Sequence, residues 1–197
     1  TTYMFSPKVL DRANTIEFRV TKEEIEQFFA ISHDLALANL KAKGRDMAKD
    51  FVELSKNRQF TNGEAKIVAQ TITSFFDHLK KAGAEFGFRT SSEIVRLINQ
   101  LSIVDPSLSL NEKLDVGIMQ KLLPKLHGSR RKLCPILLTL GKLCVTDKIN
   151  SIEKEVFDLE DYNFNDTNET KYPISLEKIV RMYRGAVDNG YTSYAEA

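Results

Sequence analysis

The fold class of this chain is decided by residues 62–83, which read NGEAKIVAQTITSFFDHLKKAG. Apolar residues recur there every three or four positions, as they do on one face of an α-helix. They are Ile67, Val68, Ile72, Phe75, Phe76 and Leu79. Asn62-Gly63 predicts a start just before this helix. Gly83 predicts its end, because glycine readily adopts the left-handed conformation that closes a helix. We interpret the stripe as core rather than as a cofactor pocket.

The same helical spacing continues along the chain, with local start and stop signals. Three segments have the form of a capping box, in which a Ser or Thr and a Glu three residues later bond each other's backbone N–H groups. They are Thr21–Glu24, Thr90–Glu93 and Ser109–Glu112. Pro124 is expected to kink or end the helix that follows Ser109. Ser175 is expected to cap a last helix, with Gly190 past its end. These signals predict a mainly α chain.

One segment breaks the helical pattern. Ser6-Pro7 predicts a short helix to about Ala13. Thr15 to Val20 then alternates apolar and polar residues, as a half-buried strand does. No other segment predicts a strand that could pair with it, so its partners are expected in sequence outside this chain. The chain also opens on Thr1 rather than Met, which a tag remnant, processing or a cut through a longer protein would each explain.

Composition disfavours several classes of protein. The 197 residues carry 28 Lys and Arg against 27 Asp and Glu, a formal net charge of +1. Such a balance disfavours a dedicated nucleic-acid or membrane-surface protein. No apolar run is long enough to cross a bilayer, and no signal segment opens the chain. Cys134 and Cys144 show no metal-type pairing, which fits a reducing cytoplasm. Residues 158–173 are acidic and are predicted to form a mobile surface loop.

A further charged segment is basic. Lys125, Arg130, Arg131 and Lys132 surround Gly128 and could contact a phosphate backbone. The alternative is a solvated turn between two helices, which is common in proteins of neutral charge and is the interpretation we favour. No nucleophile or metal-ligand spacing accompanies the scattered histidines, so no metal site is predicted.

Two arginines stand out by their positions. Arg12 closes the segment FSPKVLDR at residues 5–12, just before the predicted strand. Arg89 closes FGFR at residues 86–89, just before the predicted cap at Thr90. The start of a helix offers free N–H groups and the positive end of the helix dipole, and so forms a natural anion pocket. Either arginine could contact an anion there; the alternative for each is an exposed, salt-bridging side chain.

Four segments, in the expected order, resemble AAA+ nucleotide hydrolases of the McrB type, the GTP-dependent motor subunits of methylcytosine-specific restriction systems. Residues 5–13, FSPKVLDRA, followed by Ile16-Glu17-Phe18, resemble the stretch just after the sensor-1 motif. Residues 86–94, FGFRTSSEI, are similar to the sensor-2 segment. Residues 122–131, LLPKLHGSRR, look like the lid-region motif, and residues 191–197, YTSYAEA, resemble the closing segment.

The resemblance implies a fold and two site residues. The fold would be a mainly α, multi-helix lid domain with one short N-terminal strand left over from an α/β AAA+ core. Residues 1–20 would be the remnant of that core, and residues 21–197 the lid, enlarged by helices within 21–83. Arg12 would be the arginine finger, catalytic in trans at the γ-phosphate of nucleotide on a neighbouring subunit. Arg89 would be sensor 2, binding nucleotide of its own subunit.

The resemblance also implies cofactors and partners. The intact protein would hydrolyse ATP or GTP with Mg²⁺, in a cytoplasmic homo-oligomeric ring that acts on DNA together with a nuclease subunit. The phosphate-binding loop, the acidic magnesium motif and the sensor-1 residue do not occur in this sequence, so this chain alone is expected to bind no nucleotide and to be inactive. Two other hypotheses stay open. One is a non-enzymatic helical adaptor that binds protein or nucleic acid; the other is a DNA-binding domain that uses Arg130, Arg131 and Lys132.

Overall fold

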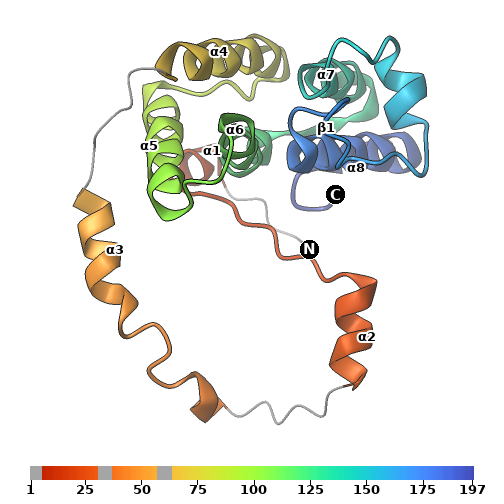
Figure 1. Ribbon diagram of the computed structural model, residues 1–197. Coiled ribbons are helices and arrows are strands. Elements are labelled where there is room, and N and C mark those ends of the chain that lie inside the picture. Colours follow the sequence, from red (N-terminus) through yellow and green to blue (C-terminus); the bar gives the residue numbers. More distant parts are fainter. Residues whose placement is uncertain (1–5, 31–36, 57–63) are drawn as a thin grey trace. The chain divides into compact units, whose positions relative to one another are not determined.

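The computed structural model describes residues 6–30, 37–56 and 64–197, and their fold is mainly α, as predicted (Figure 1). The chain divides into two compact units. The larger comprises Thr1–Thr15 and Gln59–Ala197, and the smaller comprises Ile16–Arg58. The expected boundary near residue 20, between a core remnant and a lid, stays a prediction.

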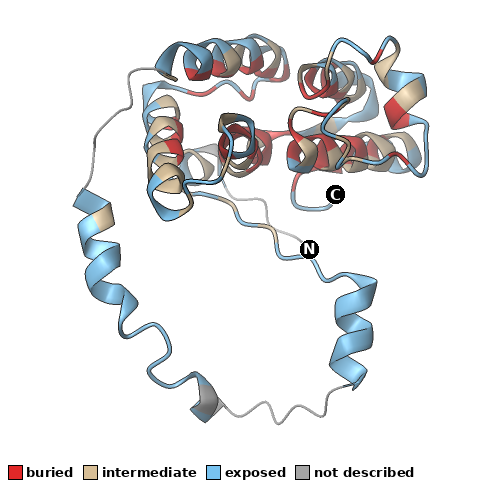
Figure 2. Cartoon of the chain, viewed as in Figure 1, coloured by how far each residue is buried: buried red, intermediate tan, exposed pale blue. Residues whose placement is uncertain are grey.

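The larger unit is built on long helices around one apolar core. They are α4 (Ala65–Ala82), α5 (Phe88–Val104), α6 (Leu110–Gly117), α7 (Arg130–Leu143) and α8 (Pro173–Asn189). α7 packs against α8 and α4, while α5 packs against α6 (Figure 1). The buried positions gather on the inward faces of these helices (Figure 2). Each helix is thus stabilised by burying an apolar stripe, since short helices alone are marginal in water.

The stripe predicted on α4 is confirmed except at one residue. Val68, Ile72, Phe75 and Leu79 are buried, at the spacing of four, three and four that one helical face requires. Ile67 lies off that seam and is 51% exposed, so its assignment to the core was wrong. Asn62 and Gly63, predicted to start this helix, lie outside the described residues.

The predicted strand at Thr15–Val20 does not form among the described residues, and because its expected partners lie outside this chain, the strand stays a prediction. These residues belong to no helix or strand here, and Ile16, Phe18 and Val20 are exposed. Among the described residues, β1 (His127–Ser129) pairs antiparallel with β2 (Tyr191–Ser193). Alternation of side chains makes a strand possible, but a strand forms only where a second segment supplies the hydrogen bonds. The short first helix, α1 (Pro7–Leu10), also ends earlier than Ala13, because Asp11 and Arg12 form a turn.

The helix that follows Ser109 ends near Pro124, as predicted. α6 continues into a π-helical turn, η2 (Ile118–Leu122), and then into a 3₁₀ turn, η3 (Leu123–Lys125), before the chain becomes extended at Leu126. Proline at 124 has no N–H to donate, which favours the end of the helical run there. A further π-helical turn, η4 (Glu153–Phe157), packs against α8.

The predicted helix caps are confirmed where the partner is local. Ser109 and Glu112 form the complete capping box of α6, and Thr21 and Glu24 exchange the same pair of bonds at α2 (Lys22–Ala30). Gly83 and Gly190 close α4 and α8 with positive φ angles of 72° and 75°. Each of these motifs is completed within one helical turn, which explains why the sequence pattern alone sufficed.

Two predicted helix caps, Thr90 and Ser175, are wrong, because each residue lies inside its helix rather than before it. α5 begins at Phe88, so Thr90 lies inside its first turn and its hydroxyl donates to Asp11. α8 begins at Pro173, so Ser175 lies inside it. The carboxylate of Asp115 on α6 accepts hydrogen bonds from the N–H groups of Ile174 and Ser175 and so caps α8.

The loop within residues 158–173 is held at its ends. Tyr162 and Tyr172 are buried, and the Tyr162 hydroxyl shares a 2.9 Å hydrogen bond with Thr170. Thr170 also forms an antiparallel bridge with Val145. The acidic stretch is therefore tied to the core at both ends, and the mobility of its exposed middle stays a prediction.

The smaller unit has no buried residue on either of its α-helices. These are α2 and α3 (Met47–Lys56), with the 3₁₀ turn η1 (Leu37–Leu40) between them. Most of the apolar side chains described in this unit are exposed (Figure 2). Among them are Phe18 at 92% exposure, Phe29 at 81% and Phe51 at 72%. Neither α2 nor α3 therefore contributes a residue to a buried core.

Candidate functional site

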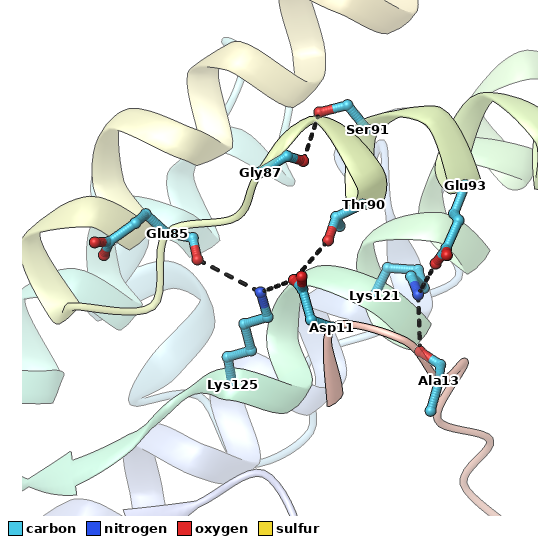
Figure 3. Close-up of polar contacts among 9 residues, drawn as sticks. All are labelled: Asp11, Ala13, Glu85, Gly87, Thr90, Ser91, Glu93, Lys121 and Lys125. Atoms are coloured by element: carbon cyan, nitrogen blue, oxygen red, sulfur yellow. Dashed lines mark hydrogen bonds and ion pairs between the residues drawn. The ribbon is translucent and has the colours of Figure 1, made fainter. Parts of the chain in front are cut away.

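One carboxylate joins three parts of the larger unit that are far apart in sequence. Asp11, in the turn after α1, accepts a hydrogen bond from the Lys125 ammonium of η3 at 2.5 Å. It accepts a second from the Thr90 hydroxyl of α5 at 2.9 Å. These partners lie 114 and 79 residues away along the chain. Figure 3 shows the three side chains converging from the three elements.

A second lysine holds the same segment two residues further on. The Lys121 ammonium of η2 donates to the carbonyl oxygen of Ala13 at 2.9 Å and forms an ion pair with Glu93 of α5 (Figure 3). Only 1% of the Lys121 side chain is exposed. A buried ammonium is costly unless it is paired and hydrogen-bonded, so these contacts are required for Lys121 to occupy this position. We call the six residues Asp11, Ala13, Thr90, Glu93, Lys121 and Lys125 the anchor cluster.

The Asp11 carboxylate forms an ion pair with Lys125. The hydrogen bond from Lys125 lowers the pKa of Asp11 below its ordinary value of 3.8, partial burial opposes this, and the Thr90 hydroxyl lowers it further. Asp11 is therefore ionised at neutral pH and compensated by Lys125. It follows that the carboxylate next to Arg12 is already paired with another cation.

Arg12 itself points toward solvent. It is exposed, and it lines an open hollow of about 400 Å³ together with Lys8, Val9 and Ala13. Within the part of the chain that the structure describes, no ion pair involves the Arg12 guanidinium. Among the described residues that line this hollow, two are cations and none is a carboxylate, an arrangement that suits an anion.

Arg89 is also exposed and lies beside the anchor cluster rather than in the hollow. It is the second residue of α5, next to Thr90, and it is absent from the residues that line the hollow of Arg12. The structure therefore brings the chain neighbours of the two arginines into contact, Asp11 with Thr90, and leaves both guanidinium groups on the surface.

The four residues of the predicted basic segment differ in how far they are available to a nucleic acid. Only 8% of the Lys125 side chain is exposed, and its ion pair with Asp11 withholds it from a nucleic acid. The Arg130 guanidinium donates to the carbonyl oxygen of Val187 at 3.2 Å. Arg131 and Lys132 are exposed. A nucleic-acid contact here would therefore depend mainly on Arg131 and Lys132.

Sequence reasoning missed Lys121 and Asp115, although a signal existed for the first. Lys121 follows Leu114 and Ile118 at seven and three positions, on the helical face that the sequence predicts to be buried. A lysine on such a face requires an acidic partner, and Glu93 supplies it. Nothing local marked Asp115, because its partners lie 59 and 60 residues further along the chain.

The described residues contain no group of three or more His, Cys, Asp or Glu that could hold a metal ion. Cys134 and Cys144 are free thiols, and burial raises the pKa of both. Among the described helices, none has the length and apolar character needed to cross a membrane.

Residues 37–191 match the family described as a domain of unknown function (DUF8727), and the chain belongs to this family. The match runs from η1 to the first residue of β2 and includes Arg89, Lys121 and Lys125, whereas Arg12 precedes it. No curated protein and no solved structure matches the chain.

Proposed function

We propose that this chain supplies the helical lid and the arginine finger of an AAA+ nucleotide hydrolase similar to the McrB type. In the intact protein, hydrolysis of ATP or GTP would be coupled to restriction or translocation of DNA. The neighbouring subunits of a homo-oligomeric ring would be its first partners, and a nuclease subunit a further one.

The observation that carries the proposal is the convergence of all four segments that resemble this family. Asp11 of the first segment contacts Thr90 of the second and Lys125 of the third. The fourth segment begins with β2, which pairs with β1 of the third.

The exposed arginines suit the roles that the resemblance implies. A guanidinium group is always charged and presents N–H donors in a fork that matches phosphate oxygens. Arg12, held from both sides by Asp11 and Ala13, would approach the γ-phosphate on a neighbouring subunit and offset the charge that develops there. An arginine finger contributes about 10³–10⁵ in rate. Arg89 would contact nucleotide of its own subunit. The described residues offer no carboxylate cluster for Mg²⁺, so residues elsewhere would hold it.

The proposal is tested in the full-length protein. Arg12→Ala should abolish hydrolysis, by about 10³-fold or more, and leave nucleotide binding nearly intact. Lys81→Ala removes an exposed cation from α4 and serves as the matched control. Hydrolysis by Arg12→Ala at the wild-type rate would rule out the finger role.

Arg89→Ala should weaken the nucleotide response within the subunit that carries it. Mixing this variant with a hydrolysis-dead subunit that retains its own Arg89 separates the cis role from a trans role. Rescue of hydrolysis by the added subunit would contradict a cis contact.

A non-enzymatic adaptor is the second candidate, and one observation favours it. The apolar faces of α2 and α3 are exposed, as an interaction surface would be. The complete gene sequence distinguishes the two candidates. A phosphate-binding loop and an acidic strand motif in the residues before Thr1 support the hydrolase, and their absence supports the adaptor.

A further inference from the structure

The two candidate arginines are connected through a single hydrogen bond. Thr90 directly follows Arg89, and Asp11 directly precedes Arg12. The Thr90 hydroxyl donates to the Asp11 carboxylate at 2.9 Å (Figure 3). Thr90 is fully buried, whereas the Asp11 side chain is 33% exposed. The backbone that carries one guanidinium is thus linked to the backbone that carries the other.

The segment around Arg12 is clamped on both sides by α5. Thr90 holds Asp11 directly, and Glu93, one turn further along α5, holds Lys121, which donates to the Ala13 carbonyl oxygen. Arg12 lies between these two attachments. A displacement of the first turn of α5 must therefore either move Arg12 or break one of the two attachments.

The Thr90 hydroxyl bonds outside its own helix. A Thr or Ser inside a helix commonly donates to the carbonyl four residues earlier, as Ser91 does to Gly87 and Thr73 does to Ala69 in this chain. For Thr90 that residue is Phe86, which precedes the N-cap Gly87 and lies outside the helix, and the hydroxyl donates to Asp11, 79 positions away. The bond adds nothing to the helical pattern of α5, and its effect is to fix Asp11 against the turn that carries Arg89.

We infer that Thr90 and Asp11 are positioning residues that link the nucleotide contact of one subunit to the finger that it extends to its neighbour. This inference rests on the proposed function. When Arg89 contacts nucleotide, the first turn of α5 is held, and the Thr90–Asp11 bond holds Arg12 in its productive position. When nucleotide leaves, the turn is released and Arg12 loses its fixed position. Each subunit would thereby adjust hydrolysis at the next site according to its own occupancy.

The expected effect of breaking the bond is on rate rather than on nucleotide binding. Misplacing a catalytic group by about 1 Å can cost up to about 10²-fold in rate. A tenfold change in rate corresponds to about 1.4 kcal/mol, close to the lower end of what one hydrogen bond to a charged acceptor contributes. We therefore expect Thr90→Val to lower kcat about tenfold and to leave KM unchanged. Thr90→Ser, which keeps the hydroxyl, should restore kcat to within about twofold of wild type.

The experiment compares steady-state hydrolysis by the full-length protein and its variants over a range of ATP and GTP concentrations. Thr73→Val is the matched control, because it removes an exposed helical hydroxyl from α4. Asp11→Ala removes the same hydrogen bond from its partly exposed side and should also lower kcat. It replaces Thr90→Val in the comparison if that variant fails to fold. Melting temperatures of all variants establish that the assays compare folded proteins.

The outcomes separate this inference from the proposed function. A lower kcat with unchanged KM in Thr90→Val, restored in Thr90→Ser, supports the positioning role. Wild-type kcat in folded Thr90→Val, with Arg12→Ala inactive, overturns the inference and leaves the proposed function standing. Wild-type kcat in Arg12→Ala overturns both.

Discussion

Replacing Asp115 with alanine should remove the cap of α8 from across the core. The Asp115 oxygens accept hydrogen bonds from the backbone N–H groups of Ile174 and Ser175, both at 2.8 Å. Asp115 is 1% exposed and Ser175 is fully buried. Asp115→Ala therefore leaves the Ser175 N–H without a partner and without access to water, while the more exposed Ile174 can recover a bond to solvent.

The expected loss of stability is about 2 to 3 kcal/mol. A buried donor left unsatisfied costs about 1–3 kcal/mol, and loss of a helix cap typically costs about 1 kcal/mol. Removal of a buried carboxylate returns part of its desolvation cost, which keeps the sum at this level. Since a domain of this size is stable by only about 5–15 kcal/mol, the change is large.

Urea unfolding followed by circular dichroism measures this change. With a slope of about 2 kcal/mol/M, the unfolding midpoint of Asp115→Ala should fall by about 1 M. Asp188→Ala removes an exposed carboxylate near the end of α8 and should stay within about 0.5 kcal/mol of wild type. Equal midpoints for Asp115→Ala and Asp188→Ala would refute the capping role.

The pH dependence of Asp115 has a defined sign. Burial raises the pKa of Asp115 above its ordinary value of 3.8, and the hydrogen bonds from Ser175 and Ile174 offset only part of this. The folded state therefore holds the Asp115 proton more tightly than the unfolded state does. The resulting stabilisation is fully present below pH 3.8 and is lost as pH rises through the folded pKa. The stability of wild type relative to Asp115→Asn should fall over that interval; an unchanged difference would contradict the assigned pKa shift.

Three further predictions concern other parts of the chain. The pKa of Asp11 is lowered, chiefly by the bond from Lys125, so the stability of wild type relative to Asp11→Asn should fall as pH drops below 3.8 in unfolding titrations. A difference that grows in acid would contradict it. Gly141→Ala places a Cβ 2.6 Å from the Phe157 ring. It should lower the free energy of unfolding by about 1–2 kcal/mol in the urea assay, because the cost of overpacking exceeds the gain in helix propensity. Thr139→Ala, at an exposed position of the same helix, is the control. A peptide of residues 16–58 should show little helical circular dichroism, because two short helices without a buried face are marginal in water; strong, concentration-independent helicity would disprove this.

Local patterns predicted the helices of this chain well. The period of apolar residues in α4 and the capping box of α6 depend on residues within one or two turns of each other, so the sequence contains the whole interaction. The exposure of Ile67 shows the limit of this reasoning. A stripe predicts which face of a helix is buried, whereas the packing of α7 against α4 decides how wide that face is.

Long-range partners account for the predictions that were wrong. Threonine is a common helix cap, but the Thr90 hydroxyl donates to Asp11 instead. α5 begins at Phe88, two residues before Thr90. Ser175 likewise lies inside α8, because Asp115 supplies the cap. Thr15–Val20 has the alternation of a strand and forms none among the described residues, and the partners predicted for it lie outside this chain. The sequence did not predict the pairing of β1 with β2.

The sequence by itself determined that this chain is mainly helical, where several of its helices end, and which two arginines to consider. These properties depend on neighbours within a few residues, where propensity and spacing act directly. Tertiary structure alone decided that Asp11, Thr90 and Lys125 meet, that Lys125 is withheld from solvent, and that Arg12 and Arg89 stay exposed. Those contacts join residues 79 and 114 positions apart, and only the packing of the whole core can select such partners.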